Sequence, residues 1–307
     1  MKLLEKLISL RATSGDESAM TDFLISHIKK EMKSWKVKPK IYSGDGFQEA
    51  IVLIFGKPKT AVYAHIDSIG FTVGYNNDLI KIGGPRIIDG CKLVGQDSKG
   101  EIDTELMVIE HEDGDKTLQA VYNRKIERGT NLCFKPKFRN TKNYIQSPYM
   151  DNRLGVWVAL QLARTMENGA IAFSTYEEHH GGSAGFLARF LYEKYKIRQA
   201  LVCDITWVTE GVSHGKGVAI SMRDYGIPRR TYVNRIIEIA KKSKIPFQLE
   251  VESAGGSDGT ILQASELPID WCFIGAAEDN VHSPDEKVFK NDIESMVALY
   301  QVLIKQL

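Results

Sequence analysis

Short, almost continuously apolar segments alternate with amphipathic helical segments along most of this chain. The β-like segments cover residues 49–55, 61–65, 69–75, 170–176, 200–205, 217–222, 247–251 and 269–274. Helical periodicity is found at residues 1–10, 18–30, 154–164, 184–195, 231–243, 260–264 and 292–307. Strands without a polar face are typical of sheets covered on both sides, and the alternation is typical of α/β proteins. We therefore predict an α/β fold with a mixed, mostly parallel sheet and helices on both faces.

The second of these helices is preceded by a start signal. Ser14-Gly15-Asp16-Glu17 has the S-x-x-E spacing of a capping box, in which the first side chain and the fourth satisfy free backbone N–H groups. The pattern predicts that Ser14 caps a helix ending near Lys30.

The alternation stops between residues 76 and 145. Short β-like pieces at residues 79–82, 105–111, 118–121 and 132–134 are separated by turns rich in Gly, Asp and Asn, without a long helical period. We predict a small all-β insertion domain at 76–145, of barrel or sandwich type. Residues 1–75 and 146–307 then form the α/β domain.

Composition excludes several classes of partner. The 307 residues include 40 Lys and Arg against 39 Asp and Glu, a formal net charge of +1. Dense phosphate binding needs many clustered basic side chains, so we expect neither nucleic acid nor a membrane surface as partner. Lys2, Glu5 and Lys6 interrupt the first apolar residues, which indicates an amphipathic helix and not a signal peptide. No segment approaches the roughly 20 apolar residues of a membrane span.

The cysteines indicate a reducing environment. Cys91, Cys133, Cys203 and Cys272 are far apart and form no C-x-x-C pair. Cys203 and Cys272 lie in apolar segments, so we expect them to be buried and to pack as small hydrophobic residues. Without a disulfide framework, we expect a cytoplasmic protein.

Polar residues follow several of the predicted strands. His65 and Asp67 end one strand, Glu177 and Glu178 end another, and Asp204 follows a third. Ligands of open α/β sheets bind outside the carboxyl ends of the strands, so we expect these side chains to converge. His282 lies in a loop after a further strand, and Asp151 begins a helix.

Each of these residues also has an ordinary structural explanation. His65 suits a buried core position, Asp151 suits a helix N-cap, and His282 suits an inert loop. The two glutamates could be paired with arginines or exposed. The combination of two histidines and several strand-end carboxylates is much rarer, and nitrogen and oxygen ligands without thiolate suit Zn²⁺, Co²⁺ or Mn²⁺. A carboxylate such as Asp67 beside a ligand imidazole orients the ring.

Six motifs carry these residues in order and span nearly the whole chain. They are Ala64–Gly70, Asp151–Gly155, Glu177-Glu178, Val202–Asp204, Gly255–Gly259 and His282–Glu286. Together they resemble the M42 family of metallo-aminopeptidases, within the co-catalytic zinc exopeptidases. The chain departs from the family's usual pattern at Ser68 and Asn152, where acidic residues are usual.

The resemblance implies a role for each residue of the set. Two divalent metal ions are expected, zinc in the first place, with cobalt or manganese as alternatives. One ion is held by His65 and Asp204 and the other by Glu178 and His282, with Asp151 between them. Glu177 is the expected general base, which takes a proton from water activated by the metals and passes it to the leaving amine, and Asp67 supports His65. Short peptides are the expected substrates, in a homo-oligomer that uses a dimerisation-type insertion.

Two other functions are compatible with these residues. A metal-dependent deacylase or carboxypeptidase of the same fold would share almost the same chemistry. A non-enzymatic scaffold would retain the fold, but such proteins usually lose a ligand or the base, and here all of them are present.

Overall fold

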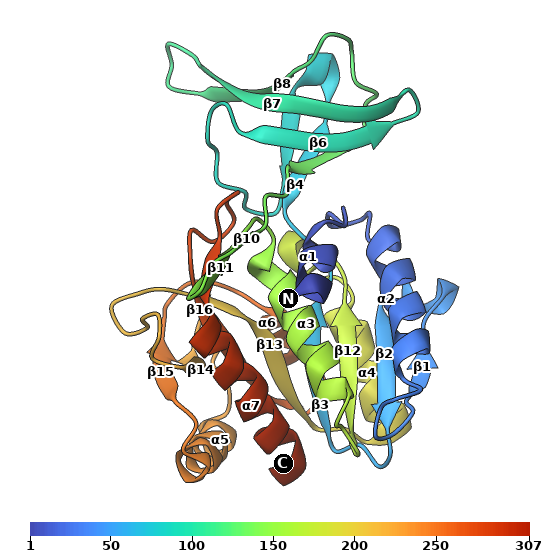
Figure 1. Ribbon diagram of the computed structural model, residues 1–307, viewed down its shortest axis with the longest axis vertical. Coiled ribbons are helices and arrows are strands. Elements are labelled where there is room, and N and C mark those ends of the chain that lie inside the picture. Colours follow the sequence, from blue (N-terminus) through green and yellow to red (C-terminus); the bar gives the residue numbers. More distant parts are fainter.

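The computed structural model describes residues 1–307, which form two β-sheets, one large and one small (Figure 1). The large sheet has the order β1-β2-β12-β3-β13-β16-β17-β11-β10, and β14 and β15 extend it beside β16. Its strands are β1 (Lys40–Tyr42), β2 (Ile51–Phe55), β3 (Thr60–His65), β10 (Arg139–Asn140), β11 (Tyr144–Gln146), β12 (Gly169–Ser174), β13 (Gln199–Trp207), β14 (Val218–Arg223), β15 (Phe247–Val251), β16 (Asp270–Asp279) and β17 (Lys287–Phe289). The central strands β12, β3, β13 and β16 run parallel, whereas β1, β2, β17, β11 and β10 pair antiparallel. The mixed α/β sheet that the sequence predicts is confirmed.

Helices cover both faces of this sheet. The helices are α1 (Lys2–Ile8), α2 (Ser18–Glu31), α3 (Met150–Ala163), α4 (Ala184–Tyr195), α5 (Arg230–Ser243), α6 (Asp258–Ala264) and α7 (Lys290–Gln306). Along β3, Val62 and Ala64 belong to a core that includes residues of α1, α2, α3, α5 and α7, whereas Ala61 and Tyr63 belong to a core that includes residues of α4 and α6. Successive side chains of a strand point to opposite faces, so two buried faces require the almost continuous apolar strands seen in the sequence. No helix is long and apolar enough to cross a membrane.

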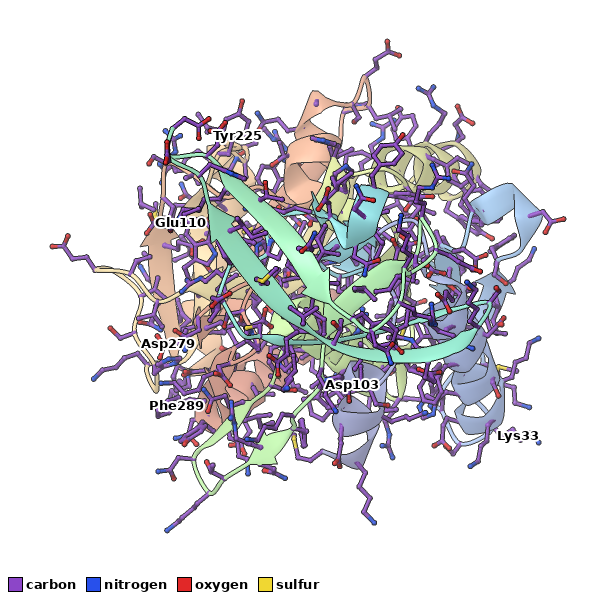
Figure 2. All side chains as sticks on the ribbon, turned by 90° about the horizontal axis from the view of Figure 1, so that it is seen from above. Lys33, Asp103, Glu110, Tyr225, Asp279 and Phe289 are labelled. Atoms are coloured by element: carbon purple, nitrogen blue, oxygen red, sulfur yellow. The ribbon has the colours of Figure 1, made fainter.

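The small sheet stands beyond one end of the large one (Figure 1). Its order is β5-β4-β9-β6-β7-β8, and every pair is antiparallel. The strands are β4 (Gly70–Val73), β5 (Leu79–Ile82), β6 (Lys92–Asp97), β7 (Gly100–Glu110), β8 (Lys116–Val121) and β9 (Asn131–Phe134). A separate core that includes Phe71, Leu93 and Phe134 lies within it. Seen from above, β7 lies across the rest of the molecule, with Asp103 and Glu110 on its course (Figure 2).

The chain passes from one sheet to the other at different points from the predicted domain boundaries at residues 75 and 145. The sequence predicts segment 69–75 as part of the α/β domain, but its strand β4 pairs with β5 and β9 of the small sheet. At the other end, β10 and β11 precede residue 146 but join the large sheet through β17. A short apolar run has the same pattern in either sheet, so only the strand pairing decides where it belongs.

The predicted capping box is wrong. Helix α2 begins at Ser18 with Glu17 as its N-cap, and no side chain caps it. Ser14 and Glu17 instead form hydrogen bonds with distant segments near the candidate site. A capping pattern shows that two side chains can form hydrogen bonds with backbone N–H groups, but it does not show which N–H groups they bind.

Several strands have no clear apolar pattern in the sequence. The strands β1, β6 and β17 were not predicted. Strand β16 was predicted at residues 269–274 but continues to Asp279. In contrast, α4 covers Ala184–Tyr195, the predicted range. All four cysteines are free, and Cys203 and Cys272 are buried as expected.

Candidate metal centre

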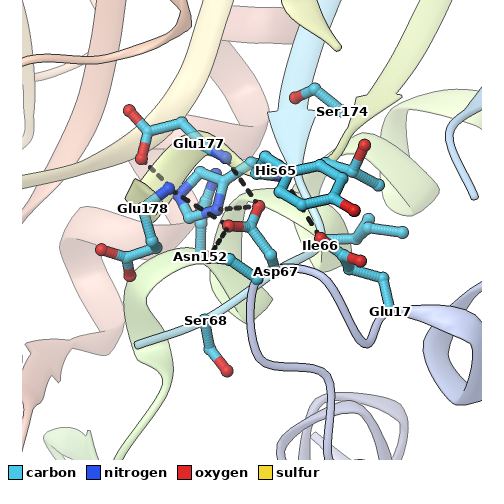
Figure 3. A network of polar contacts seen from close by, with 12 residues as sticks. Glu17, His65, Ile66, Asp67, Ser68, Asn152, Ser174, Glu177 and Glu178 are labelled. Carbon is cyan, nitrogen blue, oxygen red and sulfur yellow. Dashed lines mark hydrogen bonds and ion pairs between the residues drawn. The ribbon is translucent and has the colours of Figure 1, made fainter. Parts of the chain in front are cut away.

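The candidate ligands come from distant segments and meet beyond the carboxyl ends of the central parallel strands. They are His65, the last residue of β3; Asp151, in the first turn of α3; Glu177 and Glu178, in the 3-10 helix η3 (Glu177–His179) after β12; Asp204, in β13; and His282, between β16 and β17. The close-up view shows His65, Asp67, Glu177 and Glu178 near one another (Figure 3). The expected convergence of the strand ends therefore occurs in the fold.

His65 faces two carboxylates. Its Nε2 atom lies 3.0 Å from Asp151 Oδ1 and 3.5 Å from Asp204 Oδ2. Ala61 and Tyr63 of β3, and Ala200 and Val202 of β13, belong to the core beneath α4 and α6. His65 follows Tyr63 by two positions and Asp204 follows Val202 by two, and side chains two positions apart in a strand point to the same face. Both side chains therefore point to the face that α4 and α6 cover. The three side chains form one group whose ligand atoms lie within 4.8 Å of one another.

A second group shares Asp151 with the first. Nε2 of His282 lies 3.3 Å from Asp151 Oδ2 and 3.2 Å from Glu178 Oε2. The ligand atoms of Asp151, Glu178 and His282 also lie within 4.8 Å of one another. One oxygen of Asp151 thus faces each histidine, as a carboxylate between two cations would.

The donor chemistry fits divalent cations. Oε1 of Glu178 is buried and has no hydrogen-bond partner, so this carboxylate is only partly satisfied by the protein. The two groups offer imidazole nitrogen and carboxylate oxygen, which suit Zn²⁺, Co²⁺ and Mn²⁺. Buried carboxylates without partners are costly, and a coordinated cation removes that cost.

The same crowding shifts the pKa values of the site. Burial alone would lower the pKa of His65, but the carboxylates of Asp204 and Asp151 outweigh burial and raise it. The pKa of His282 is raised in the same way by Glu178 and Asp151, against the effect of burial. Both imidazoles therefore lie where the surrounding carboxylates stabilise positive charge, which two bound cations would supply instead of protons.

Glu177 lies beside the two groups without belonging to either. Its Oε2 is 3.9 Å from His65 Nε2. Burial raises the pKa of Glu177 well above its ordinary range; His65 opposes this, while Asp204 and Glu178 reinforce it. A carboxylate with a raised pKa accepts a proton more readily than an ordinary glutamate does, as a general base must.

Asp67 is fully buried beneath this arrangement and accepts hydrogen bonds from three residues. The donors are the Ser14 hydroxyl at 2.6 Å and the backbone N–H groups of Glu177 and Glu178, each at 3.1 Å. Figure 3 shows Asp67 beside Glu177 and Glu178. Its Oδ1 also lies 3.4 Å from His65 Nδ1, without the geometry of a hydrogen bond. Asp67 therefore positions η3 at least as directly as it positions His65.

Glu17 supports the residue just before η3. One oxygen of its buried side chain accepts the backbone N–H groups of Gly15 at 2.9 Å and Tyr176 at 3.3 Å. Tyr176 has the left-handed backbone φ of 61°, which is unusual for a tyrosine. Glu17 and Asp67 together hold three consecutive backbone N–H groups, at residues 176 to 178. No pattern in the sequence around Glu17 indicated this role.

Glu286 was also missed, although it lies in one of the recognised motifs. Its two oxygens accept the backbone N–H groups of Asp151, at 3.2 Å, and His282, at 2.9 Å. One fully buried carboxylate thus holds the backbone of Asp151, which both groups share, and of His282, which belongs to the second group. The position of Glu286 four residues after His282 was the only signal in the sequence.

Asn152 has a role that an aspartate could not fill. Its Nδ2 donates to the Cys203 carbonyl at 2.9 Å, and its Oδ1 accepts from Gly155 N at 2.8 Å. An aspartate could accept but not donate. A Cβ atom at Gly155 would collide with Asn152 Oδ1 and the Cys203 carbonyl, so the glycine permits this contact between α3 and β13.

The small sheet contributes to the site through its connecting segment. His282 Nδ1 lies 3.1 Å from the carbonyl oxygen of Gly84, which follows β5. A hydrogen bond from Nδ1 leaves Nε2 free for a metal. The backbone N–H of Gly83 in turn donates to His179 Nδ1 at 3.2 Å. His179 therefore contacts the segment that orients His282.

A cavity of about 280 Å³ opens directly at these groups. Its walls include Asp151, Glu177, Glu178, Asp204 and His282. This volume is near the lower end of the range for small-molecule pockets, about 300–1,000 Å³. The candidate metal centre is therefore accessible to a small ligand.

Sequence comparison identifies a family. The model of the M42 glutamyl aminopeptidase family matches residues 93–299. A protein of Acetivibrio thermocellus named "Putative aminopeptidase" is 26% identical over 327 aligned positions, which cover 97% of this chain and 96% of that protein.

Solved structures share the fold. An aminopeptidase from the archaeon Desulfurococcus kamchatkensis superposes with a TM-score of 0.87 at 22% identity, covering 100% of this chain and 94% of that one. The TET1 peptidase of Pyrococcus horikoshii, described as assembling into a tetrahedron or a large octahedral shell, has a TM-score of 0.83 at 22% identity, with coverage of 100% and 99%.

Proposed function

The chain belongs to the M42 glutamyl aminopeptidase family, and from that premise we propose that it releases N-terminal residues from short peptides at the candidate metal centre. The observation that supports this most strongly is the pair of ligand groups that share Asp151, with Glu177 beside them.

In this proposal the chain holds two divalent ions. His65 and Asp204 would hold one, Glu178 and His282 would hold the other, and Asp151, which belongs to both groups, would contribute to each. When bound, the ions would lower the pKa of water and polarise the scissile carbonyl group. Zinc is the first candidate, and cobalt and manganese suit the same donors.

Glu177 then acts as general base and acid. Its carboxylate accepts the proton of the attacking water and returns it to the amine that leaves. Burial raises the pKa of Glu177 and Asp204 and Glu178 reinforce this, so its carboxylate accepts a proton more readily than an ordinary glutamate does. Asp67 holds Glu177 through its backbone N–H, so the base keeps its place beside His65.

We extend the proposal to domains, assembly and location. The large sheet with its helices is the catalytic domain, and the small sheet is a dimerisation-type insertion. The chain forms a homo-oligomer, as the structural relative from Pyrococcus horikoshii does. The four free cysteines favour the cytoplasm.

The test is a panel of substrates for the metal-loaded protein. Peptides with a free N-terminus are compared with the same peptides N-acetylated, and the products are identified by mass spectrometry. We expect stepwise loss of N-terminal residues from the free peptides only. Cleavage confined to the acylated peptides would identify a deacylase, and loss of C-terminal residues a carboxypeptidase; either result would refute the proposal.

A further inference from the structure

The cavity at the metal centre extends well beyond the candidate catalytic groups. Its other wall includes Thr206 and Trp207 of β13, Asp224 after β14, Glu250 of β15, Glu252 just after β15, and Phe273 of β16. No lysine or arginine lines the cavity. This second half has three carboxylates that neither ligand group nor the proposed mechanism uses.

Two of these carboxylates are buried and form no ion pair. Asp224 is 7% exposed, and Glu250 is 3% exposed. Asp224 Oδ1 accepts the backbone N–H of Gly226 at 2.6 Å, and Glu250 accepts the Thr206 hydroxyl. Both donors are neutral. The guanidinium of Arg223 donates to the backbone carbonyl of Asp224, at 3.2 Å, and not to its carboxylate.

Such a pair is unfavourable in an empty cavity. Removing a carboxylate from water costs free energy unless an opposite charge or several hydrogen bonds compensate it. Burial accordingly raises the pKa of Asp224 to about 6, and it raises the pKa of Glu250. A cation that enters the cavity would compensate both groups.

The remaining walls suit the stem of a long basic side chain. Trp207 is 40% exposed, and its ring packs against Gly255, where a Cβ atom would come within 3.5 Å of the ring. Phe273 offers a second aromatic surface. Lysine and arginine place their methylene groups on apolar surface, and their charged ends also interact favourably with aromatic faces.

We propose that this acidic half of the cavity binds the side chain of the substrate's N-terminal residue and selects lysine or arginine. The inference rests on the proposed aminopeptidase function and adds its substrate class. An N-terminal glutamate would meet Asp224, Glu250 and Glu252 with like charge, so this chain should differ from the glutamyl preference in the family's description.

The first experiment uses the metal-loaded wild-type protein and three aminoacyl p-nitroanilides. Lysine and norleucine have side chains with the same four-carbon stem and differ in the terminal ammonium group. Their free α-amino group is common to both, so the ratio of their kcat/KM values isolates the side-chain charge. We expect lysine to exceed norleucine by at least about tenfold, as for one hydrogen bond to a charged group, and glutamate to be the poorest.

The second experiment assigns the preference to residues. Asp224→Asn and Glu250→Gln should each reduce the lysine-to-norleucine ratio by roughly three- to tenfold, mainly through the lysine substrate. Asp103→Asn is the matched control, because it removes one negative charge from β7 of the small sheet, where Asp103 pairs with Lys135. That variant should keep the wild-type ratio.

The outcomes separate the two proposals. A wild-type ratio near one, or a preference for glutamate, with efficient cleavage of free-amine substrates overturns the inference and leaves the aminopeptidase function intact. No cleavage of any free-amine substrate refutes the aminopeptidase function, and the inference with it. If the Asp224 and Glu250 variants fail to fold, the wild-type ratio decides alone. An unchanged ratio in both folded variants also overturns the assignment.

Discussion

Asp67 Oδ1 accepts a hydrogen bond from the backbone nitrogen of Glu177 at 3.1 Å, so the carboxylate beside His65 also holds the candidate general base. The other carboxylate oxygen, Asp67 Oδ2, accepts a hydrogen bond from the backbone nitrogen of Glu178 at 3.1 Å. The backbone carbonyl of Asp67 accepts from the buried guanidinium of Arg153 at 3.3 Å. A proposed ligand and the proposed base thus depend on one buried side chain.

Asp67→Asn should impair the site without removing any proposed ligand. Asparagine can accept from one of the two backbone N–H groups, but its amide nitrogen would face the other donor. We expect a loss of about 10–100-fold in metal affinity or in kcat, as for other residues that orient ligands. Isothermal titration with Zn²⁺ and steady-state kinetics measure both. Ser14→Ala is the control, because it removes one neutral donor to Asp67 and should have a smaller effect. Unchanged affinity and kcat in Asp67→Asn would contradict this role.

Glu177→Gln should separate metal binding from turnover. Glutamine has nearly the same shape but cannot accept a proton from water. We expect kcat to fall by roughly 10²–10⁴-fold while the metal content stays at the wild-type value. Elemental analysis and kinetics on the same preparation test this. A variant with nearly normal kcat would remove Glu177 from the role of base.

Metal stoichiometry should distinguish Asp151 from the other ligands. His282→Ala removes a ligand from one group only, so we expect about one ion per chain to be retained after dialysis. Asp151→Ala removes a ligand that both groups share, and both ions should bind weakly. Asp103→Asn, outside the site, should retain the wild-type content. Equal metal loss in the His282 and Asp151 variants would argue against a bridging carboxylate.

Glu17→Gln should change how stability depends on pH. Burial raises the pKa of Glu17 to about 7 from its ordinary value of about 4.5, so the folded state binds its proton more tightly than the unfolded state does. The contribution of Glu17 to stability is therefore greatest below about pH 4.5 and declines as the pH rises to about 7. Glutamine cannot ionise, and its Oε1 can accept the same two backbone N–H groups.

We therefore expect wild type and Glu17→Gln to have similar stability at low pH. Above about pH 7 the variant should be the more stable, by on the order of 2–3 kcal/mol. Urea unfolding at a series of pH values measures the difference, with Glu112→Gln in an exposed loop as the control for loss of a carboxylate. A difference that does not change with pH would show that Glu17 has the same pKa in both states.

Residues with a local pattern could be placed from the sequence. The apolar periodicity located the central strands because burial on both faces leaves no room for polar residues in them. It also placed His65, Glu177 and Glu178 near strand ends, where the structure has them. Asp204 lies within β13, because that strand continues through Trp207 beyond its most apolar part.

Contacts between distant segments left no such pattern. Ser14 and Asp67 are 53 residues apart, and Glu17 and Tyr176 are 159 apart. The local sequence around Ser14 and Glu17 indicated a helix cap instead. In the same way, the short strands β4, β10 and β11 could have joined either sheet, and pairing alone assigned them.

The sequence by itself determined the α/β class, the order of the main elements and the residues offered as ligands. These follow from hydrophobic periodicity and residue chemistry, which act over a few positions of the chain. Only the tertiary structure decided that Asp151 faces both histidines and that Asp67 and Glu17 hold the backbone of residues 176–178. It also decided that Asp224 and Glu250 share the cavity with Glu177 and Glu178. Those relationships depend on distances between side chains brought together by folding, and such distances are set by the packing of whole sheets and helices.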